Sequence, residues 1–340
     1  MIRSTRRRML AGTAATALLA TSLGVAVSAT ASAAPGGAAP RTCTISTLPY
    51  PADTYRADAY AIDPTGRYVA GTALRVGEVD NQYLLLFWDG QQVTEVEVPG
   101  MAQPVDVNAD GVVIGNGSAV GAGIGQPWIY RDGKLEQLPV LPSTGIFVTA
   151  INDAGDIVGY GSDIVPGEFV GLRWPAARPG TVEVLKAPAN AQPIGITPNG
   201  TIVGHAGPFG DWTGWVRRPN GRIESLGVPG GGSTTVSAVA GRWATGLVWL
   251  GGTSATKVRW DLRNGSHTLL DQEIPSVTDI NAKGVVVGGD RVGRGATSRV
   301  LPGGGEGVGV GARSISDTGT IVGFRNVYAD RVTPVRWTGC

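Results

Sequence analysis

Three oxygen-bearing side chains occupy alternate positions in one short segment, namely Asp106, Asn108 and Asp110, with Gly111 directly after them. A calcium-binding loop begins with this spacing, because alternate side chains converge on one ion. Such a loop needs a bidentate Glu at its twelfth position, where this chain has Gly117. In related segments of the chain, the place of Asp106 is taken by Ala61, Ala150, Gly195 and Ser314. We therefore predict that Asp here bonds to its own turn, and we expect no cofactor and no metal. Calcium binding by Asp106, Asn108 and Asp110 is the alternative.

Catalytic signatures are few. The chain has only two histidines, His205 and His267, and it contains no HExxH, GxSxG or P-loop motif. Zinc hydrolysis, elbow-serine hydrolysis and nucleotide phosphate binding therefore lack their usual patterns. A pair of loop carboxylates of the glycosidase kind could still form in space. The candidates for such a pair are Asp163, Glu168, Asp211 and Asp290.

Aromatic and polar residues gather in segments that we expect to be loops. Exposed aromatic rings beside acids and amides suit the recognition of carbohydrate or peptide, and loops often carry function. The candidate ligand-binding residues are Trp212, Asp211, His205, Phe209, Tyr160, Glu168, Asp163 and Arg325. Trp212 ranks first, because Trp215 fills a tryptophan position that recurs along the chain and leaves Trp212 without a packing role.

Two function classes follow. The first is a non-catalytic binding module for a glycan, cell-wall or protein ligand. The alternative is a carbohydrate-active enzyme, a lyase or a glycosidase, that uses loop carboxylates with His205; an architectural wall or spore-surface protein is a third possibility.

The elements that must position these residues come from an internal repeat. Each copy has an apolar strand, a polar turn with glycine, and a second strand that we expect to end at another glycine. The copies are AYAIDPTGRYVAG at 59, PVDVNADGVVIG at 104, VTAINDAGDIVG at 148, PIGITPNGTIVG at 193, VSAVAGRWATG at 236, VTDINAKGVVVG at 277 and ARSISDTGTIVG at 312. A tight turn favours glycine because its backbone adopts positive φ at little cost.

Most copies continue with a third strand that carries tryptophan and a fourth strand. Four short strands in about 43 residues match the strand number and length expected for one blade of a β-propeller. The sixth copy lacks the tryptophan and has TSRVL where we expect the third strand. The predicted fold class is an all-β, seven-bladed β-propeller, with residues 42–340 as one domain. An open β-solenoid is the alternative, although its rungs are usually shorter.

Closure of the ring is predicted from the chain ends. The last copy stops at VRWTGC after its third strand, and TCTISTLPYP at 42–51 has the form of the missing fourth strand. The only two cysteines, Cys43 and Cys340, flank this splice. In an exported protein they are expected to form a disulfide. Free thiols or an intermolecular bridge are the alternatives.

Export is predicted from the amino-terminal residues. Arg3, Arg6, Arg7 and Arg8 precede an apolar stretch and an AxA site that ends at Ala33. This pattern is typical of a signal peptide over residues 1–33, either secretory or of the twin-arginine kind; an uncleaved membrane anchor is the alternative. Residues 34–41 are expected to form a disordered leader. We thus expect a secreted, extracellular monomer with no membrane association after cleavage.

Charge argues against nucleic acid as a partner. The whole chain has a net charge of +1, and removal of the four signal arginines leaves 24 basic against 27 acidic residues, a net charge of −3. Phosphate binding needs clustered Lys and Arg, which this balance does not favour.

The repeat resembles the HAF-repeat family of extracellular proteins. The shared pattern is AxxIN, two residues, GxIVG and then a W and G with a leucine-containing strand, and VTAINDAGDIVG is the closest copy. The resemblance covers the chain from about Ala59 to its carboxyl end. The His-Ala-Phe tripeptide that names the family is absent, and LLFW, QPW, GLRW, GWV and VRW stand in its place. The resemblance implies export and repeats and no assigned activity.

Overall fold

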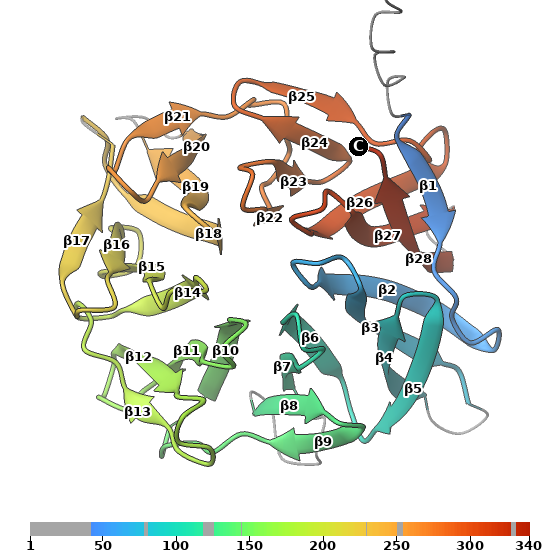
Figure 1. Cartoon of the computed structure of the whole chain (residues 1–340), viewed down its shortest axis with the longest axis horizontal. Helices are drawn as coiled ribbons and strands as arrows, with labels where there is room; N and C mark the ends of the chain where they lie inside the picture. The colour runs from blue at the N-terminus through green and yellow to red at the C-terminus, as the bar shows by residue number, and fades with distance from the viewer. Residues whose placement is uncertain are drawn as a thin grey trace, which may run out of the picture. The chain divides into compact units, whose positions relative to one another are not determined.

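The computed structural model describes residues 42–77, 81–117, 126–143, 145–228, 230–249, 254–327 and 331–340. The predicted signal peptide at 1–33 and the leader at 34–41 lie outside these ranges. Within them, all regular secondary structure is β-strand. Small sheets follow one another around a common axis as a β-propeller, with β2, β6, β10, β14, β18, β22 and β26 innermost (Figure 1). No helix in the described part of the chain has the length and apolarity to cross a membrane.

Five sheets are separate four-stranded blades, each formed by consecutive antiparallel strands. Their strands are β6 (Ala102–Val107), β7 (Val113–Gly117), β8 (Pro127–Arg131) and β9 (Lys134–Gln137); β10 (Gly145–Ile151), β11 (Ile157–Ser162), β12 (Phe169–Trp174) and β13 (Glu183–Val184); β14 (Gln192–Ile196), β15 (Ile202–Ala206), β16 (Thr213–Arg217) and β17 (Ile223–Leu226); β18 (Thr234–Ala240), β19 (Trp243–Trp249), β20 (Ala255–Asp261) and β21 (His267–Leu269); and β22 (Asp279–Ile280), β23 (Val286–Gly288), β24 (Arg291–Arg294) and β25 (Thr297–Val300).

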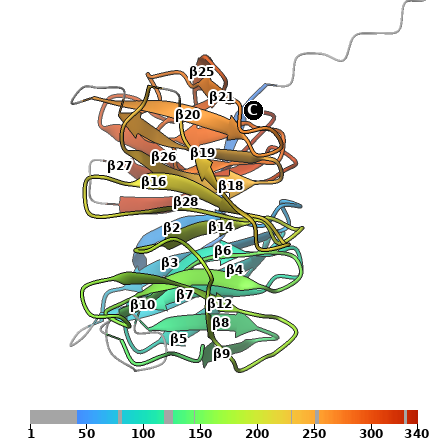
Figure 2. The same cartoon turned by 90° about the vertical axis from the view of Figure 1, so that its left-hand side faces the viewer.

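The other eight strands form one sheet, which corrects the expectation of seven separate blades. Its strands are β1 (Thr44–Thr47), β2 (Thr54–Ile62), β3 (Tyr68–Arg75), β4 (Gln82–Asp89), β5 (Gln92–Val98), β26 (Val308–Ile315), β27 (Ile321–Val327) and β28 (Arg331–Thr338). The two four-stranded parts meet where β2 and β28 lie side by side, as Figures 1 and 2 both show. The junction is a single parallel pair, Arg56 with Val332. The long β2 and β28 reach each other there, so hydrogen bonding continues from one part to the other.

The ring closes through both chain ends, as predicted. Strand β1 pairs antiparallel with β28, with Thr44 opposite Thr338 and Thr47 opposite Val335. Beside this pairing, Cys43 and Cys340 form a disulfide with a Cα–Cα distance of 4.4 Å. The amino-terminal strand therefore supplies the edge that the last repeat lacks, and the edge of β28 is covered over this stretch.

All seven predicted turn glycines have positive φ, from 54° at Gly241 to 93° at Gly319. The second glycine was expected to end its strand, which holds only for Gly288 at the end of β23; in the other six repeats the strand continues, as β3 does past Gly71 to Arg75. In six repeats, a register shift in the first strand marks a bulge opposite this glycine. A Cβ at Gly159 would lie 2.0 Å from the Phe147 carbonyl oxygen. Glycine recurs here because the bulge brings a carbonyl into the place of a side chain.

Tryptophans connect successive repeats. The indole N–H of Trp174 donates to the carbonyl of Pro139 in the preceding repeat at 2.8 Å. Trp88, Trp260 and Trp337 do the same toward the carbonyls of Pro49, Gly227 and Pro302. The apolar core lies between neighbouring sheets; one cluster, for example, joins Ala61 and Leu85 to Trp128. These rings therefore pack between successive repeats.

Two tryptophans do not occupy the recurring position, which corrects the argument made for Trp215. Trp174 pairs with Ile157, two residues before the repeat glycine Gly159. Trp215 instead pairs with the glycine itself, Gly204, and Trp128 likewise pairs with Gly115. Arg217 and Tyr130 take the recurring place. The indole nitrogens of Trp128 and Trp215 are buried with no partner among the described residues, because the shift moves them away from the acceptor carbonyl.

The sixth repeat also differs from the prediction. Its third strand is β24, and the TSRV segment forms the fourth strand, β25. Gly293 pairs with Val286 and so stands where tryptophan stands elsewhere. The strands β22 and β23 are two and three residues long. A shortened hairpin therefore replaces the tryptophan strand that the other repeats have.

Candidate functional site

Two regions collect polar or aromatic side chains, and they lie at opposite ends of the strands. The repeat turns after the innermost strands border a cavity on the propeller axis, which we call the axial pocket. The connections between second and third strands carry the aromatic residues that the sequence analysis selected.

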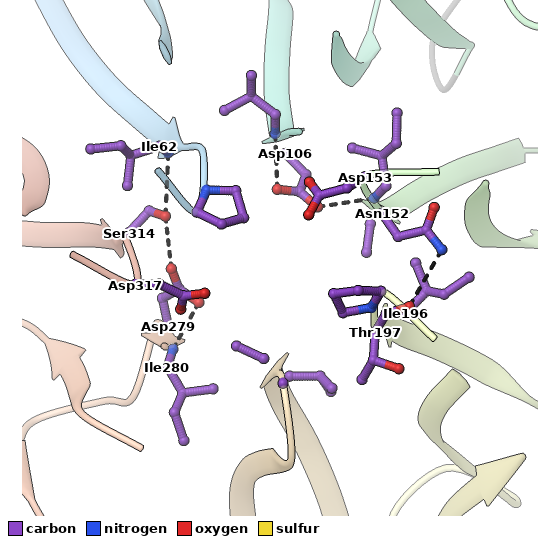
Figure 3. A pocket seen from close by; sticks show the side chains of 18 of the residues that line it. Ile62, Asp106, Asn152, Asp153, Ile196, Thr197, Asp279, Ile280, Ser314 and Asp317 are labelled. Carbon is purple, nitrogen blue, oxygen red and sulfur yellow. Dashed lines mark hydrogen bonds between the residues drawn. The ribbon is translucent and has the colours of Figure 1, made fainter. Parts of the chain in front are cut away.

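The axial pocket has a volume of about 140 Å³, and four aspartates from four different repeats line it. They are Asp106, Asp153, Asp279 and Asp317, and Figure 3 shows them in two groups on opposite sides of the axis. No Lys, Arg or His is among the described residues that line this cavity. The pocket therefore gathers four carboxyl groups with no cationic side chain among its described lining residues.

Asp106 connects two blades. Its Oδ1 accepts a hydrogen bond from the Val107 N–H at 2.8 Å, and its Oδ2 accepts one from the Ile151 N–H in β10 at 2.9 Å. Burial raises the pKa of Asp106 to about 7, although both hydrogen bonds favour the charged form. The carboxylate thus satisfies two N–H groups near the bulges.

Asp279 repeats this arrangement and was missed as a site residue. Its Oδ1 accepts from the Ile280 N–H at 2.7 Å, and its Oδ2 accepts from the Ile315 N–H at 2.9 Å and from the Ser314 hydroxyl at 2.7 Å. Burial raises its pKa to about 6. The signal was present in the sequence, because VTDIN places Asp279 where PVDVN places Asp106.

The calcium candidates point in different directions. Both oxygens of Asp106 face backbone N–H groups, and Oδ1 of the buried Asn108 accepts from the Asp110 and Val112 N–H groups at 3.2 and 3.0 Å. Asp110 is exposed on the turn. The described residues hold no cluster of three or more His, Cys, Asp or Glu side chains arranged for a metal. Asn108 bonds to the turn, whereas Asp106 bonds within β6 and to the next blade, which corrects the prediction that Asp106 bonds to its own turn.

At the other end of the strands, Trp212 lies between two predicted partners. Its ring centroid is 5.7 Å from His205 and 5.4 Å from Phe209. Phe209 is 95% exposed. The Trp212 N–H donates to the Ser233 hydroxyl at 2.9 Å, and its carbonyl accepts from the Thr234 N–H at 2.6 Å. The β15–β16 turn is therefore fixed to the chain that leads into β18.

A second aromatic group lies on the adjacent blade. Tyr160 is 5.5 Å from Phe147 and 5.6 Å from Phe169, centroid to centroid. Asp163 and Glu168 hold the turn between them: the Asp163 N–H donates to the Glu168 carbonyl at 3.1 Å, and the Asp163 Oδ1 accepts from the Gly167 N–H at 3.0 Å. Phe147 is an addition to the predicted set; the alternation of β10 could have revealed it.

His205 has a structural contact that bears on the enzyme alternative. Its Nδ1 accepts a hydrogen bond from the Val236 N–H in the next blade at 3.3 Å, and burial lowers its pKa. Asn116 fills the same place two blades earlier, where its Oδ1 accepts from the Val148 N–H at 2.9 Å. The lowered pKa therefore favours the neutral form of His205, and its Nδ1 is already engaged.

The remaining predicted residues lie apart from this group. The Arg325 Nε donates to the Gly303 carbonyl at 3.0 Å on the β26–β28 part of the large sheet. Asp211 is exposed in the same turn as Trp212, and its N–H donates to the Pro208 carbonyl at 3.0 Å. The structure thus brings together His205, Phe209, Asp211 and Trp212, places Tyr160 on the neighbouring blade, and leaves Arg325 elsewhere.

Comparison with known proteins supports the fold. No protein-family model matches the chain, and no curated protein matches its sequence. Among solved structures, a catalytically inactive virginiamycin B lyase from Staphylococcus aureus, with quinupristin, aligns with a TM-score of 0.53 at 12% identity over 86% of this chain and 99% of that one. The β-propeller domain of the Trilobed protease from Pyrococcus furiosus aligns with a TM-score of 0.58 at 11% identity over 83% and 96%. The Pyrococcus horikoshii acylaminoacyl peptidase aligns with a TM-score of 0.56 at 12% identity, over 83% of this chain and 51% of that one. At these identities the likeness shows a shared β-propeller fold.

Proposed function

We propose that this protein is an extracellular binding module for a glycan or protein ligand. Its recognition surface is the aromatic loop face, which we define as His205, Phe209 and Trp212 with Tyr160 and Phe169 on the neighbouring blade. No catalytic role is assigned to these residues.

The exposure of Phe209 carries this proposal. Its ring is 95% exposed and stands edge-on to Trp212 at 5.4 Å. An exposed phenyl ring on a fixed turn gains nothing for folding, whereas an apolar face against it would gain from leaving water. Sugar rings and peptide side chains both present such faces.

The second aromatic group is free to serve the same surface. Asn116 and His205 each accept a hydrogen bond from a backbone N–H of the next blade. Tyr160 occupies the equivalent position in its own repeat, but the residue of the next blade that would donate to it is Pro193, which has no N–H. Tyr160 therefore has no bond of this kind to make, and its ring packs on Phe169, which is 38% exposed.

Export and family membership belong to the same proposal. The arginine-rich, apolar amino terminus supports secretion, and the Cys43–Cys340 disulfide is a bond that oxidising compartments maintain. We also propose that the eight-stranded sheet acts as two blades, since one residue pair joins its parts. The ring would then have seven blades, and the chain would be an HAF-repeat protein and a monomer.

The enzyme alternative has weaker support. Three carboxylates have raised pKa values. Asp106 and Asp279 lie in the axial pocket and bond to backbone N–H groups, and the buried Asp58 pairs with Arg313. Asp163 holds its own turn, and His205 Nδ1 is engaged by Val236. We therefore favour binding without turnover.

A glycan and peptide array tests the proposal. The wild type is compared with Phe209→Ala and Trp212→Ala, and with Tyr55→Ala as a control, because Tyr55 is 51% exposed on β2, in a different sheet from the aromatic loop face. We expect one ligand class to bind the wild type and the control and to be lost from both loop variants. Equal binding by all four proteins would reject the proposed surface. Cleavage of an array ligand by the wild type would favour the enzyme alternative.

A further inference from the structure

A second cavity, independent of the proposed recognition surface, is lined by arginines. It has a volume of about 470 Å³ and lies between the β14–β17 and β18–β21 blades, at the repeat turns. Arg218, Arg242 and Arg263 line it, and none of the described residues that line it is acidic. Thr197, Asn199 and Thr201 add hydroxyl and amide groups. We call it the arginine cavity.

The positive charge around this cavity exceeds the negative charge that faces it. Arg218 and Arg222 share one carboxylate, Glu224, at 2.8 and 2.5 Å, while Arg242 pairs with Asp261. The exposed Arg263 side chain has no hydrogen bond or ion pair within the described ranges, although its N–H donates to Asp261. An excess of cations on one concave surface attracts anions.

Part of the arginine cluster is fixed in place before any ligand arrives. The guanidinium carbons of Arg242 and Arg259 lie 4.4 and 4.2 Å from the Trp243 ring centroid. Arg259 also donates through Nη1 to the Gly284 carbonyl at 2.7 Å. Burial, with the nearby charges of Arg294 and Arg242, lowers the pKa of Arg259. These contacts hold Arg242 and Arg259 near the cavity in spite of the repulsion between their positive charges.

The neighbouring axial pocket limits what can bind. Thr197, Pro198 and Gly241 line both cavities, so the arginine cavity adjoins the axial pocket that the four aspartates line. A chain with a charge on every unit would meet repulsion there. A ligand with one oxyanion flanked by neutral units would pair with the arginines and leave only hydroxyl groups near the aspartates.

We propose that the arginine cavity binds the oxyanion group, carboxylate or sulfate, of an acidic glycan whose charged sugars alternate with neutral ones. Arg263 and the free edge of Arg242 donate to the oxyanion. Arg218 is held by Glu224 and by the Leu262 carbonyl, and it fixes the cavity wall.

Titration calorimetry with defined probes tests this site. The probes are a hyaluronan hexasaccharide for the carboxylate, a chondroitin sulfate hexasaccharide for the sulfate, neutral chitohexaose and a thymidine oligonucleotide. The variants are Arg263→Gln and Arg263→Glu. Arg67→Gln is the matched control, because Arg67 is an exposed arginine outside the cavity that pairs with Asp89. Trp212→Ala separates this site from the aromatic loop face.

We expect an acidic hexasaccharide to bind the wild type with an affinity that falls as salt rises. Arg263→Gln is expected to weaken binding about tenfold, the usual effect of losing a charged hydrogen bond, and Arg263→Glu to abolish it. Arg67→Gln and Trp212→Ala are expected to bind as the wild type does.

Five results would each overturn the proposal. Four of them are no binding of either acidic hexasaccharide, equal binding of chitohexaose, equal weakening by Arg67→Gln and Arg263→Gln, and tighter binding of the oligonucleotide than of both glycans. Loss of binding in Trp212→Ala alone would move the acidic glycan to the loop face and would also reject the arginine cavity.

Discussion

The carboxylate of Asp106 in β6 accepts a hydrogen bond from the backbone N–H of Ile151 in β10, at 2.9 Å. The two residues are 45 positions apart in the chain, the length of about one repeat. This contact stabilises the junction between adjacent blades, and Asp279 makes the same contact with Ile315. Substitutions at Asp106 and Asp279 therefore test how much these contacts stabilise the junctions between blades.

Stability should depend on pH through Asp106 and Asp279. Their pKa values in the folded chain, about 7 and about 6, lie above the ordinary value of 3.8. Between these values the folded chain holds more protons than the unfolded chain, so these two groups add stability as the pH falls from 8 to 5 and lose it as the pH rises. For Asp106 alone, the free energy of unfolding should rise by on the order of 2 kcal/mol from pH 8 to pH 5.

Denaturant unfolding at pH 5 and pH 8 measures this effect against Asp106→Asn. Acids with lowered pKa, such as Asp89 and Glu224, act in the opposite direction in both proteins, so the difference between the two proteins isolates Asp106. A wild type and a variant with equal pH dependence would show that Asp106 titrates normally.

The indole hydrogen bonds should separate two tryptophans that are equally buried. Trp174→Phe loses the bond to the Pro139 carbonyl, whereas the indole nitrogen of Trp215 has no described partner to lose. Trp174→Phe and Trp215→Phe both lose packing area, but Trp174→Phe should lower the free energy of unfolding by about 1 kcal/mol more. The free energies of unfolding of the two variants decide this; an equal cost would mean that the indole bonds add nothing.

The repeat glycine Gly159 and the loop glycine Gly180 should differ in their tolerance of alanine. Gly159→Ala would place a methyl group 2.0 Å from the Phe147 carbonyl oxygen, so we expect a loss above about 3 kcal/mol or a chain that does not fold. Gly180 has positive φ and open space around it, and Gly180→Ala should cost only about 1 kcal/mol. Thermal unfolding of both variants tests the bulge, and a tolerated Gly159→Ala would contradict it.

The disulfide should stabilise the ring, because the bond joins residues 297 positions apart. Replacing Cys43 and Cys340 by Ser is expected to cost up to about 5 kcal/mol in the chain-entropy description. Urea unfolding of the variant and of the wild type with and without reductant measures the loss. If the reduced wild type is as stable as the oxidised one, the four-residue pairing of β1 with β28 closes the ring alone.

Local repeat chemistry made most of the fold predictable. Turn glycines, β-branched strands and the split last repeat predicted the hairpins, the pairing of β1 with β28 and the disulfide. Residue type alone does not give strand register, so Trp215 was placed two residues from its true position. The pairing of Arg56 in β2 with Val332 in β28 likewise joins two long strands, and no sequence motif predicts it.

The candidate site was predicted less completely. The turn sequence led to His205, Phe209 and Trp212, which the structure does bring together. The bond from the Val236 N–H to His205 and the grouping of four aspartates on the axis depend on contacts between repeats. An alignment of the repeats that compares polar positions could have found Asp279. The grouping of arginines around Arg263 depends on the fold and could not be predicted from the sequence alone.

Recognition through the β15–β16 turn is tested most directly by titrating the strongest array ligand into wild type, Phe209→Ala and Tyr55→Ala. Phe209 is so exposed that its loss should leave folding unchanged. The account predicts one ligand per chain, binding at least tenfold weaker in Phe209→Ala and unchanged binding in Tyr55→Ala. Wild-type affinity in a folded Phe209→Ala protein would contradict it.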